Sequence, residues 1–176
     1  MFTRRSIAAP ATILVAGGCL VAAATAPGAG TATAPQKITP AGVGAVKLGK
    51  TFRALRRAGL VGKLRRGCPL GGPNTRSARL RSPLRGSVDF TRTTPRKVRN
   101  IAIRGGATAR GVGVGDRPAD IRAAFPKARF DHGTDETFGV TLVRIPKNGG
   151  GRLQFAVDVD TRRVTLIGVP VIAFCE

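Results

Sequence analysis

The sequence predicts an α+β fold made of two fused repeats, each a short helix followed by antiparallel strands. Val46 aligns with Val112 at an offset of 66 residues, and the same offset aligns Leu55 with Ile121. A fixed offset of this kind indicates internal duplication. In each copy the spacing of apolar residues also changes from helical to alternating. A helix followed by strands, twice over, is an α+β layout.

The first repeat, residues 38–104, begins with a short helix over 52–58. Thr51 supplies an N-cap oxygen for this helix, whose apolar residues recur at helical spacing. Alternating apolar residues then predict strands over 84–91 and 98–103, joined by a turn that contains proline.

The second repeat, residues 105–176, has the same order of elements with different residues at the helix ends. Asp116 is the expected N-cap, and Pro126 stops the helix. Three strands are then expected. They cover residues 137–145, 153–159 and 164–169. Strands that alternate in this way have one buried and one exposed face.

The N-terminal residues 1–26 have the charge, apolar core and small-residue order of a secretory signal peptide. A disordered Ala/Gly/Thr/Pro spacer is expected over 27–37. The protein is therefore expected to be secreted and extracellular, or associated with the cell envelope. Two alternatives stay open for the leader: an uncleaved membrane anchor, and a lipoprotein modified at Cys19.

Removal of the leader beyond Cys19 leaves Cys68 and Cys175, an even count in an oxidising compartment. A disulfide between them is the simplest expectation, and it would tie the first repeat to the end of the second. The alternative is two reduced, separately buried thiols.

Positive charge is concentrated in the first repeat. The whole chain has a net charge of +21, and residues 38–104 contain four Lys and thirteen Arg against Asp89 alone. Such a surface attracts phosphate or carboxylate polymers. The candidate polyanion-binding residues are Arg53, Arg56, Arg57, Lys63, Arg65, Arg66, Arg76, Arg79, Arg81 and Arg85. Compositional bias toward arginine is the competing explanation.

Enzyme signals are sparse. His132 is the single histidine, and it lies near Asp131, Asp135 and Glu136 in a Gly/Thr loop without metal-binding spacing. The glycine-rich stretch 111–116 lacks the spacing of a nucleotide-binding loop. The sequence therefore predicts no enzyme, no cofactor and no metal, with a hydrolase or metal site around His132 as the third hypothesis.

The phrases at 48–55 and 114–121, a glycine just before a capped short helix, resemble the beta-lactamase inhibitory protein fold and the related small outer-membrane assembly lipoprotein domains. More broadly, the chain resembles secreted proteins of actinobacteria. The resemblance implies an interaction module that binds other proteins.

These observations favour a secreted, non-enzymatic binding protein whose basic repeat associates with an anionic envelope polymer or with lipid head groups. An acidic protein is a further expected partner, peripheral membrane contact is compatible with the charge, and export excludes intracellular nucleic acid. The alternative is a protein-protein interaction or inhibitor module.

Overall fold

The computed structural model describes residues 34–69, 74–146 and 152–174. Of these residues, 46% are in strands and 14% are helical, so the fold is mostly β and the α+β prediction is wrong. The helices are only one or two turns long, and extra short strands form a second sheet that the apolar spacing did not indicate. The predicted signal peptide and Cys19 lie outside the described residues.

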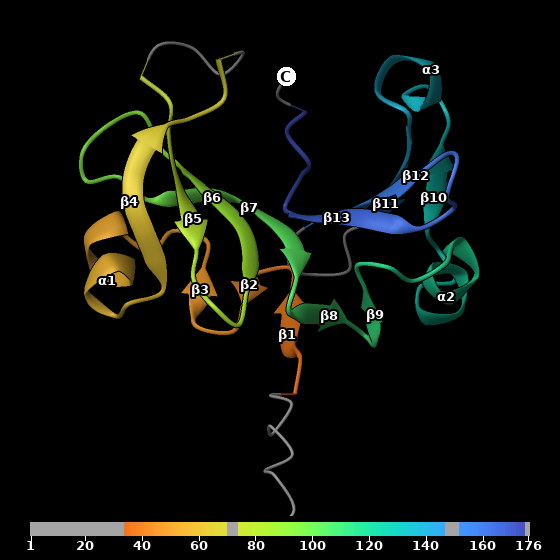
Figure 1. Cartoon of the computed structure of the whole chain (residues 1–176), viewed down its shortest axis with the longest axis horizontal. Helices are drawn as coiled ribbons and strands as arrows, with labels where there is room; N and C mark the ends of the chain where they lie inside the picture. Colours follow the sequence, from red (N-terminus) through yellow and green to blue (C-terminus); the bar gives the residue numbers. More distant parts are fainter. Residues whose placement is uncertain (1–33, 70–73, 147–151, 175–176) are drawn as a thin grey trace, which may run out of the picture. The chain divides into compact units, whose positions relative to one another are not determined.

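The larger sheet has eight antiparallel strands within the described part of the chain (Figure 1). In sheet order they are β10 (Arg129–Asp131), β11 (Val140–Ile145), β12 (Leu153–Asp158), β13 (Val164–Val169), β7 (Val98–Gly105), β6 (Arg85–Phe90), β5 (Arg76–Leu80) and β4 (Val61–Arg66). Strands β13 and β7 meet at the centre, where Ile167 pairs with Ile103 and Val169 with Ile101. We call β4 to β7 the first half-sheet and β10 to β13 the second half-sheet.

A smaller sheet is formed by short strands from residues 36–47 and 107–113. Its order is β3 (Val46–Lys47), β2 (Gly42–Val43), β1 (Gln36–Thr39), β8 (Ala107–Ala109) and β9 (Val112–Gly113). Strands β1 and β8 pair in parallel, so this sheet joins residues 36–47 to residues 107–113. Strand β1 begins at Gln36, inside the stretch expected to be spacer.

The described helices are α1 (Phe52–Arg57), α2 (Pro118–Ala124) and α3 (Asp135–Phe138). Thr51 caps α1 as predicted, because its side chain accepts a hydrogen bond of 3.2 Å from the Ala54 N–H. The predicted cap of α2 is wrong: Arg117 is the N-cap, and Asp116 instead accepts from the Gly113 N–H at 2.7 Å. Helix α3 occupies the start of the predicted strand 137–145, which begins at Val140. None of the described helices has the length and apolar character needed to cross a membrane.

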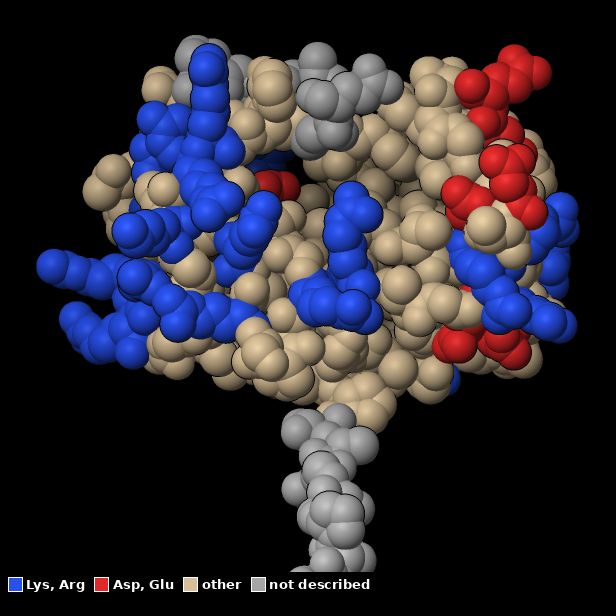
Figure 2. Space-filling view, viewed as in Figure 1, with Lys and Arg blue, Asp and Glu red and all other residues tan. Residues whose placement is uncertain are grey.

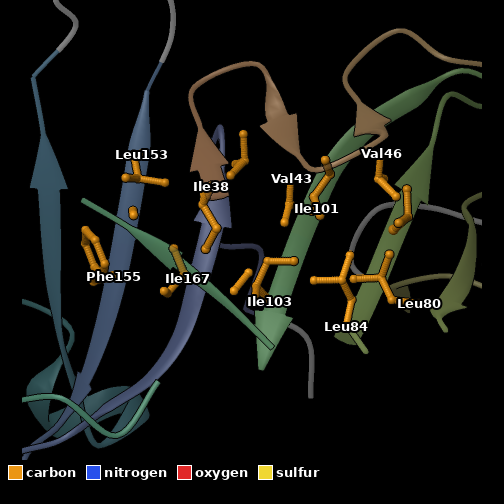
Figure 3. Packing of buried hydrophobic residues seen from close by; sticks show 14 of the residues in the cluster. Ile38, Val43, Val46, Leu80, Leu84, Ile101, Ile103, Leu153, Phe155 and Ile167 are labelled. Atoms are coloured by element: carbon orange, nitrogen blue, oxygen red, sulfur yellow. The ribbon is translucent and has the colours of Figure 1, made fainter. Parts of the chain in front are cut away.

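The core lies on the face of the large sheet that packs against α1, α2 and the small sheet (Figure 3). Ile101, Ile103, Phe155 and Ile167 are fully buried there. Leu55 of α1 and Ile121 of α2, which align at the offset of 66 residues, belong to the same buried cluster. Burial of each such side chain stabilises the fold by about 1.5–3 kcal/mol.

The opposite face of the sheet, which we call the open face, is partly covered by the C-terminal tail, residues 170–174. Leu142, Ala156 and Leu166 pair across β11, β12 and β13, and Ile172 packs on them. The Ile172 N–H donates to the Gln154 side chain at 2.7 Å. The tail therefore closes the open face of the second half-sheet.

Candidate anion-binding face

Strand pairing identifies the side chains that share the open face. Residues directly opposite on antiparallel strands point to the same side of a sheet. Gly168 pairs with Ala102, Ala102 with Ser87, and Ser87 with Arg79. Ala102 packs against the cluster under the tail, so Ser87 and Arg79 also lie on the open face.

A hollow of about 710 Å³ opens beside this row on the first half-sheet. Its polar lining comes from three adjacent strands and the turn between two of them. These residues are Arg79, Ser82, Arg85, Ser87 and Arg104. Gly105 makes room for Arg85, because a Cβ atom there would lie 2.5 Å from the guanidinium. The hollow therefore combines three guanidinium groups with two hydroxyl groups.

Ion pairing differs between the two half-sheets. In the second half-sheet, Arg144 of β11 lies 2.6 Å from Asp131 of β10. In contrast, Arg79, Arg85 and Arg104 have no carboxylate within 4.0 Å among the described residues. Figure 2 shows the same contrast, with basic side chains gathered over the first half-sheet and α1 and acidic ones gathered near α3.

Unpaired guanidinium groups are suited to bind phosphate or carboxylate oxygens. The planar fork of arginine donates two parallel hydrogen bonds to such groups, and these charge-assisted bonds are stronger than neutral ones. The exposed positions of Arg79, Arg85 and Arg104 leave their donors accessible to a ligand. The hollow can therefore hold an anionic group without displacing an acidic partner.

The ten residues predicted to bind a polyanion are distributed over several elements. Arg53, Arg56 and Arg57 lie on α1, which packs on the core side of the sheet. Lys63, Arg65 and Arg66 are on β4, and Arg81 follows β5. Only Arg79 and Arg85 line the hollow, while Arg76 lines a different cavity.

Arg104 completes the hollow, although the sequence analysis did not select it. Ile101 and Ile103 are buried in β7, and Arg104 follows them at an exposed position. Alternation along the strand was the signal that could have identified Arg104. Arg99 lines the neighbouring cavity instead, at a register shift that leaves it opposite no residue of β6.

Asp89, the acid of the first repeat, lies in a second cavity on the open face. Cross-strand pairing places it beside Asn100, in a cavity of about 250 Å³. Burial raises the pKa of Asp89, although Asn100 and Arg99 favour its ionised form. Asn100 is only 6% exposed, so the two side chains lie together in a desolvated part of the open face. Desolvation is thus the dominant influence on Asp89.

Cys68 lines the same cavity and is disulfide-bonded. Its partner lies outside the described residues, as Cys175 does. The Cys68–Cys175 disulfide therefore stays a prediction.

The acidic cluster around His132 is divided in the structure. His132 Nδ1 lies 2.8 Å from Asp135 Oδ2, and this hydrogen bond lowers the pKa of Asp135. Asp131 instead pairs with Arg144 and accepts from the Gly133 N–H. Among the described residues, no group of three or more His, Cys, Asp and Glu is placed to hold a metal ion. A hydrolase around His132 stays a hypothesis.

No family model matches this chain, and neither a curated protein nor a solved structure matches it. The resemblance to the beta-lactamase inhibitory protein fold therefore stays an expectation from the sequence. The function must be inferred from the chemistry of the open face.

Proposed function

We propose that this protein is a secreted, non-enzymatic binding protein that holds an anionic cell-envelope polymer on the open face of its first half-sheet. The proposal is based mainly on the positions of three arginines. Arg79, Arg85 and Arg104, from three adjacent strands, line one hollow and have no carboxylate partner among the described residues. A guanidinium cluster of this kind is suited to a phosphate or carboxylate group.

A polymer fits better than a single small anion because a further cation, Arg65, lies beyond the hollow on the same face. Arg65 pairs with Ser77, which pairs with Asp89. Asp89 and Ser77 lie two residues along their strands from Ser87 and Arg79, so they point to the same face, and Arg65 extends the positive surface toward β4. Successive charges of a polymer can engage both places, and each released counterion makes binding more sensitive to salt.

The test measures retention of the mature protein on immobilised glycerol phosphate teichoic acid across a salt gradient. We expect Arg79→Gln, Arg85→Gln and Arg104→Gln together to elute at clearly lower salt than the wild type. The matched control is Lys50→Gln, Arg53→Gln and Arg57→Gln, which removes the same charge from exposed positions in and beside α1. The control variant should elute close to the wild type.

Two results would contradict the proposal. Equal loss of retention in both triple variants would mean that net charge alone determines binding. Retention of the wild type that does not change with salt would mean that the polymer is not held by charge.

A protein-protein interaction module is the second candidate, and exposed apolar side chains favour it. Phe138 is 39% exposed and Val171 is 37% exposed. The Phe138 ring stacks on Phe174 at a centroid distance of 4.5 Å. Binding to a protein partner that persists at high salt and is lost on Phe138→Ser would favour this function over polymer binding.

A further inference from the structure

A cavity of about 360 Å³ lies away from the anion-binding hollow, among the small sheet, the end of α2 and the large sheet. Its volume lies within the range of small-molecule sites, roughly 300–1,000 Å³. The apolar lining comes from five separate parts of the chain. These residues are Ile38, Ala109, Phe125, Pro126, Ile145 and Leu153.

The walls of this cavity belong to the hydrophobic core. Ile38, Phe125 and Leu153 are members of the main buried cluster, and Ile145 packs against it. Figure 3 shows Ile38 and Leu153 close together at this end of the core. A ligand that enters here therefore contacts apolar atoms on several sides, and burial of its own apolar surface favours binding.

The mouth of the cavity is positively charged. Lys37, Arg110 and Lys127 line it and are exposed, and no Asp or Glu is among its described lining residues. The Arg110 guanidinium lies 5.2 Å from the centre of the Phe125 ring and donates to the Ala124 carbonyl at 3.3 Å. Arg110 is thus fixed at the edge of an apolar space, with further donors available to a ligand.

Arg110 also has a left-handed backbone conformation, with φ at 51°. Ala109 pairs with Val112, so Arg110 and Gly111 form a two-residue hairpin turn, which requires a positive φ at both positions. The tight turn between β8 and β9 thus places the Arg110 side chain at the mouth of the cavity.

We infer that this cavity binds a monomeric fatty acid, with its acyl chain against Ile38, Phe125 and Leu153 and its carboxylate beside Arg110 and Lys127. The apolar interior accounts for the chain, and the cationic mouth accounts for the anionic head group. The site shares no residue with the hollow on the first half-sheet. The inference therefore goes beyond the proposed function and does not depend on it.

The experiment titrates laurate, below its micelle concentration, into the mature protein and measures heat and stoichiometry by calorimetry. We expect one laurate to bind per chain, dodecanol to bind more weakly because it lacks the charge, and acetate not to bind. The variant Arg110→Gln with Lys127→Gln should bind laurate about tenfold more weakly, which corresponds to about 1.4 kcal/mol. The control Lys97→Gln with Arg129→Gln removes one Lys and one Arg outside the lining and should bind as the wild type does.

A second variant tests the apolar part. Ile145→Trp places a larger side chain at the partly buried end of β11 and should abolish laurate binding, with a thermal unfolding curve to confirm that the variant folds. If it does not fold, Pro126→Trp, at an exposed lining position, replaces it. Failure of laurate to bind, equal binding by the charge variant and its control, or equal affinity for laurate and acetate would overturn the inference. Retained laurate binding in a folded cavity-filling variant would also overturn it.

Discussion

The two half-sheets have corresponding strands but opposite chemistry on the open face. In the second half-sheet the cross-strand row is Leu142, Ala156 and Leu166. In the first half-sheet the row on the corresponding strands is Ser77, Asp89 and Asn100. The apolar row is covered by Ile172 of the tail, whereas the polar row lies beside a cationic hollow.

This difference shows that the backbone arrangement does not determine what an open sheet face does. Both half-sheets contribute buried aliphatic side chains to the common core, such as Ile101 and Ile167. The residues that alternate with them are free to differ, because they do not contact the core. Different residues at those alternating positions can therefore let the tail pack on one half-sheet and leave part of the other half-sheet accessible to a ligand.

The largest expected effect comes from the row under the tail. Leu166 is 9% exposed, so Leu166→Ala should lower the free energy of unfolding by about 2–5 kcal/mol. Ser77→Ala, in the corresponding row of the first half-sheet, should change it by less than about 0.5 kcal/mol. Urea denaturation measures both. Equal effects would contradict the contrast between a buried apolar row and a polar row that does not depend on apolar burial.

A smaller effect is expected where the tail passes over β13. A Cβ atom at Gly168 would lie 2.5 Å from the Val171 carbonyl oxygen, so Gly168→Ala must displace the tail. Overpacking of this kind costs about 1–3 kcal/mol. Hydrogen exchange of the Ile172 amide should also accelerate. Gly62→Ala in the first half-sheet is the control, since its nearest contact would be an ordinary 3.7 Å, and unchanged exchange in Gly168→Ala would argue against close packing of the tail.

The two longer helices provide a third comparison. Thr51 accepts a hydrogen bond at the start of α1, so Thr51→Ala should cost about 1 kcal/mol. Arg117 begins α2 but cannot accept such a bond, so Arg117→Ala should cost less than about 0.5 kcal/mol. Chemical denaturation distinguishes the two values. A greater loss of unfolding free energy for Arg117→Ala than for Thr51→Ala would show that the Arg117 side chain stabilises α2 in another way.

The smallest effect concerns Asp89 and depends on pH. Burial raises its pKa above the ordinary 3.8, so the folded protein binds this proton more tightly than the unfolded chain does. The contribution of Asp89 to stability is therefore most favourable below pH 3.8 and falls as the pH rises through the folded pKa. Asp89→Asn should remove this dependence and slightly stabilise the protein at neutral pH. Unfolding free energies measured from acid to neutral pH would contradict this if the variant were less stable throughout.

Local signals in the sequence identified several helices and strands, but they did not indicate how much more strand than helix the fold contains. The alternation of Leu153, Phe155 and Val157 predicted β12, and Thr51 correctly marked the start of α1. Strands of two or three residues in the small sheet contain too few positions to show alternation, and they form because the long-range pairing of β1 with β8 brings them together. The α+β prediction failed for this reason.

The candidate site was predicted by charge but not by position. Arginine content identified the basic segment, but it did not separate Arg53 on α1 from Arg79 on β5. That separation depends on the strand register, which sets the face that a side chain occupies. The side chains of Gln154 and Asn100 accept hydrogen bonds from backbone N–H groups of the tail. The sequence does not indicate this role, because it depends on where the tail lies in the folded protein.

Strand β4 is the outermost strand at one end of the described large sheet, and half of its residues are Lys or Arg. An outer strand exposes unpaired backbone groups that can template the addition of another chain, which is a common route to aggregation. Lys63, Arg65 and Arg66 oppose this, because two such strands brought together would place like charges against each other. The same arginines that favour an anionic partner thus disfavour self-association through this edge.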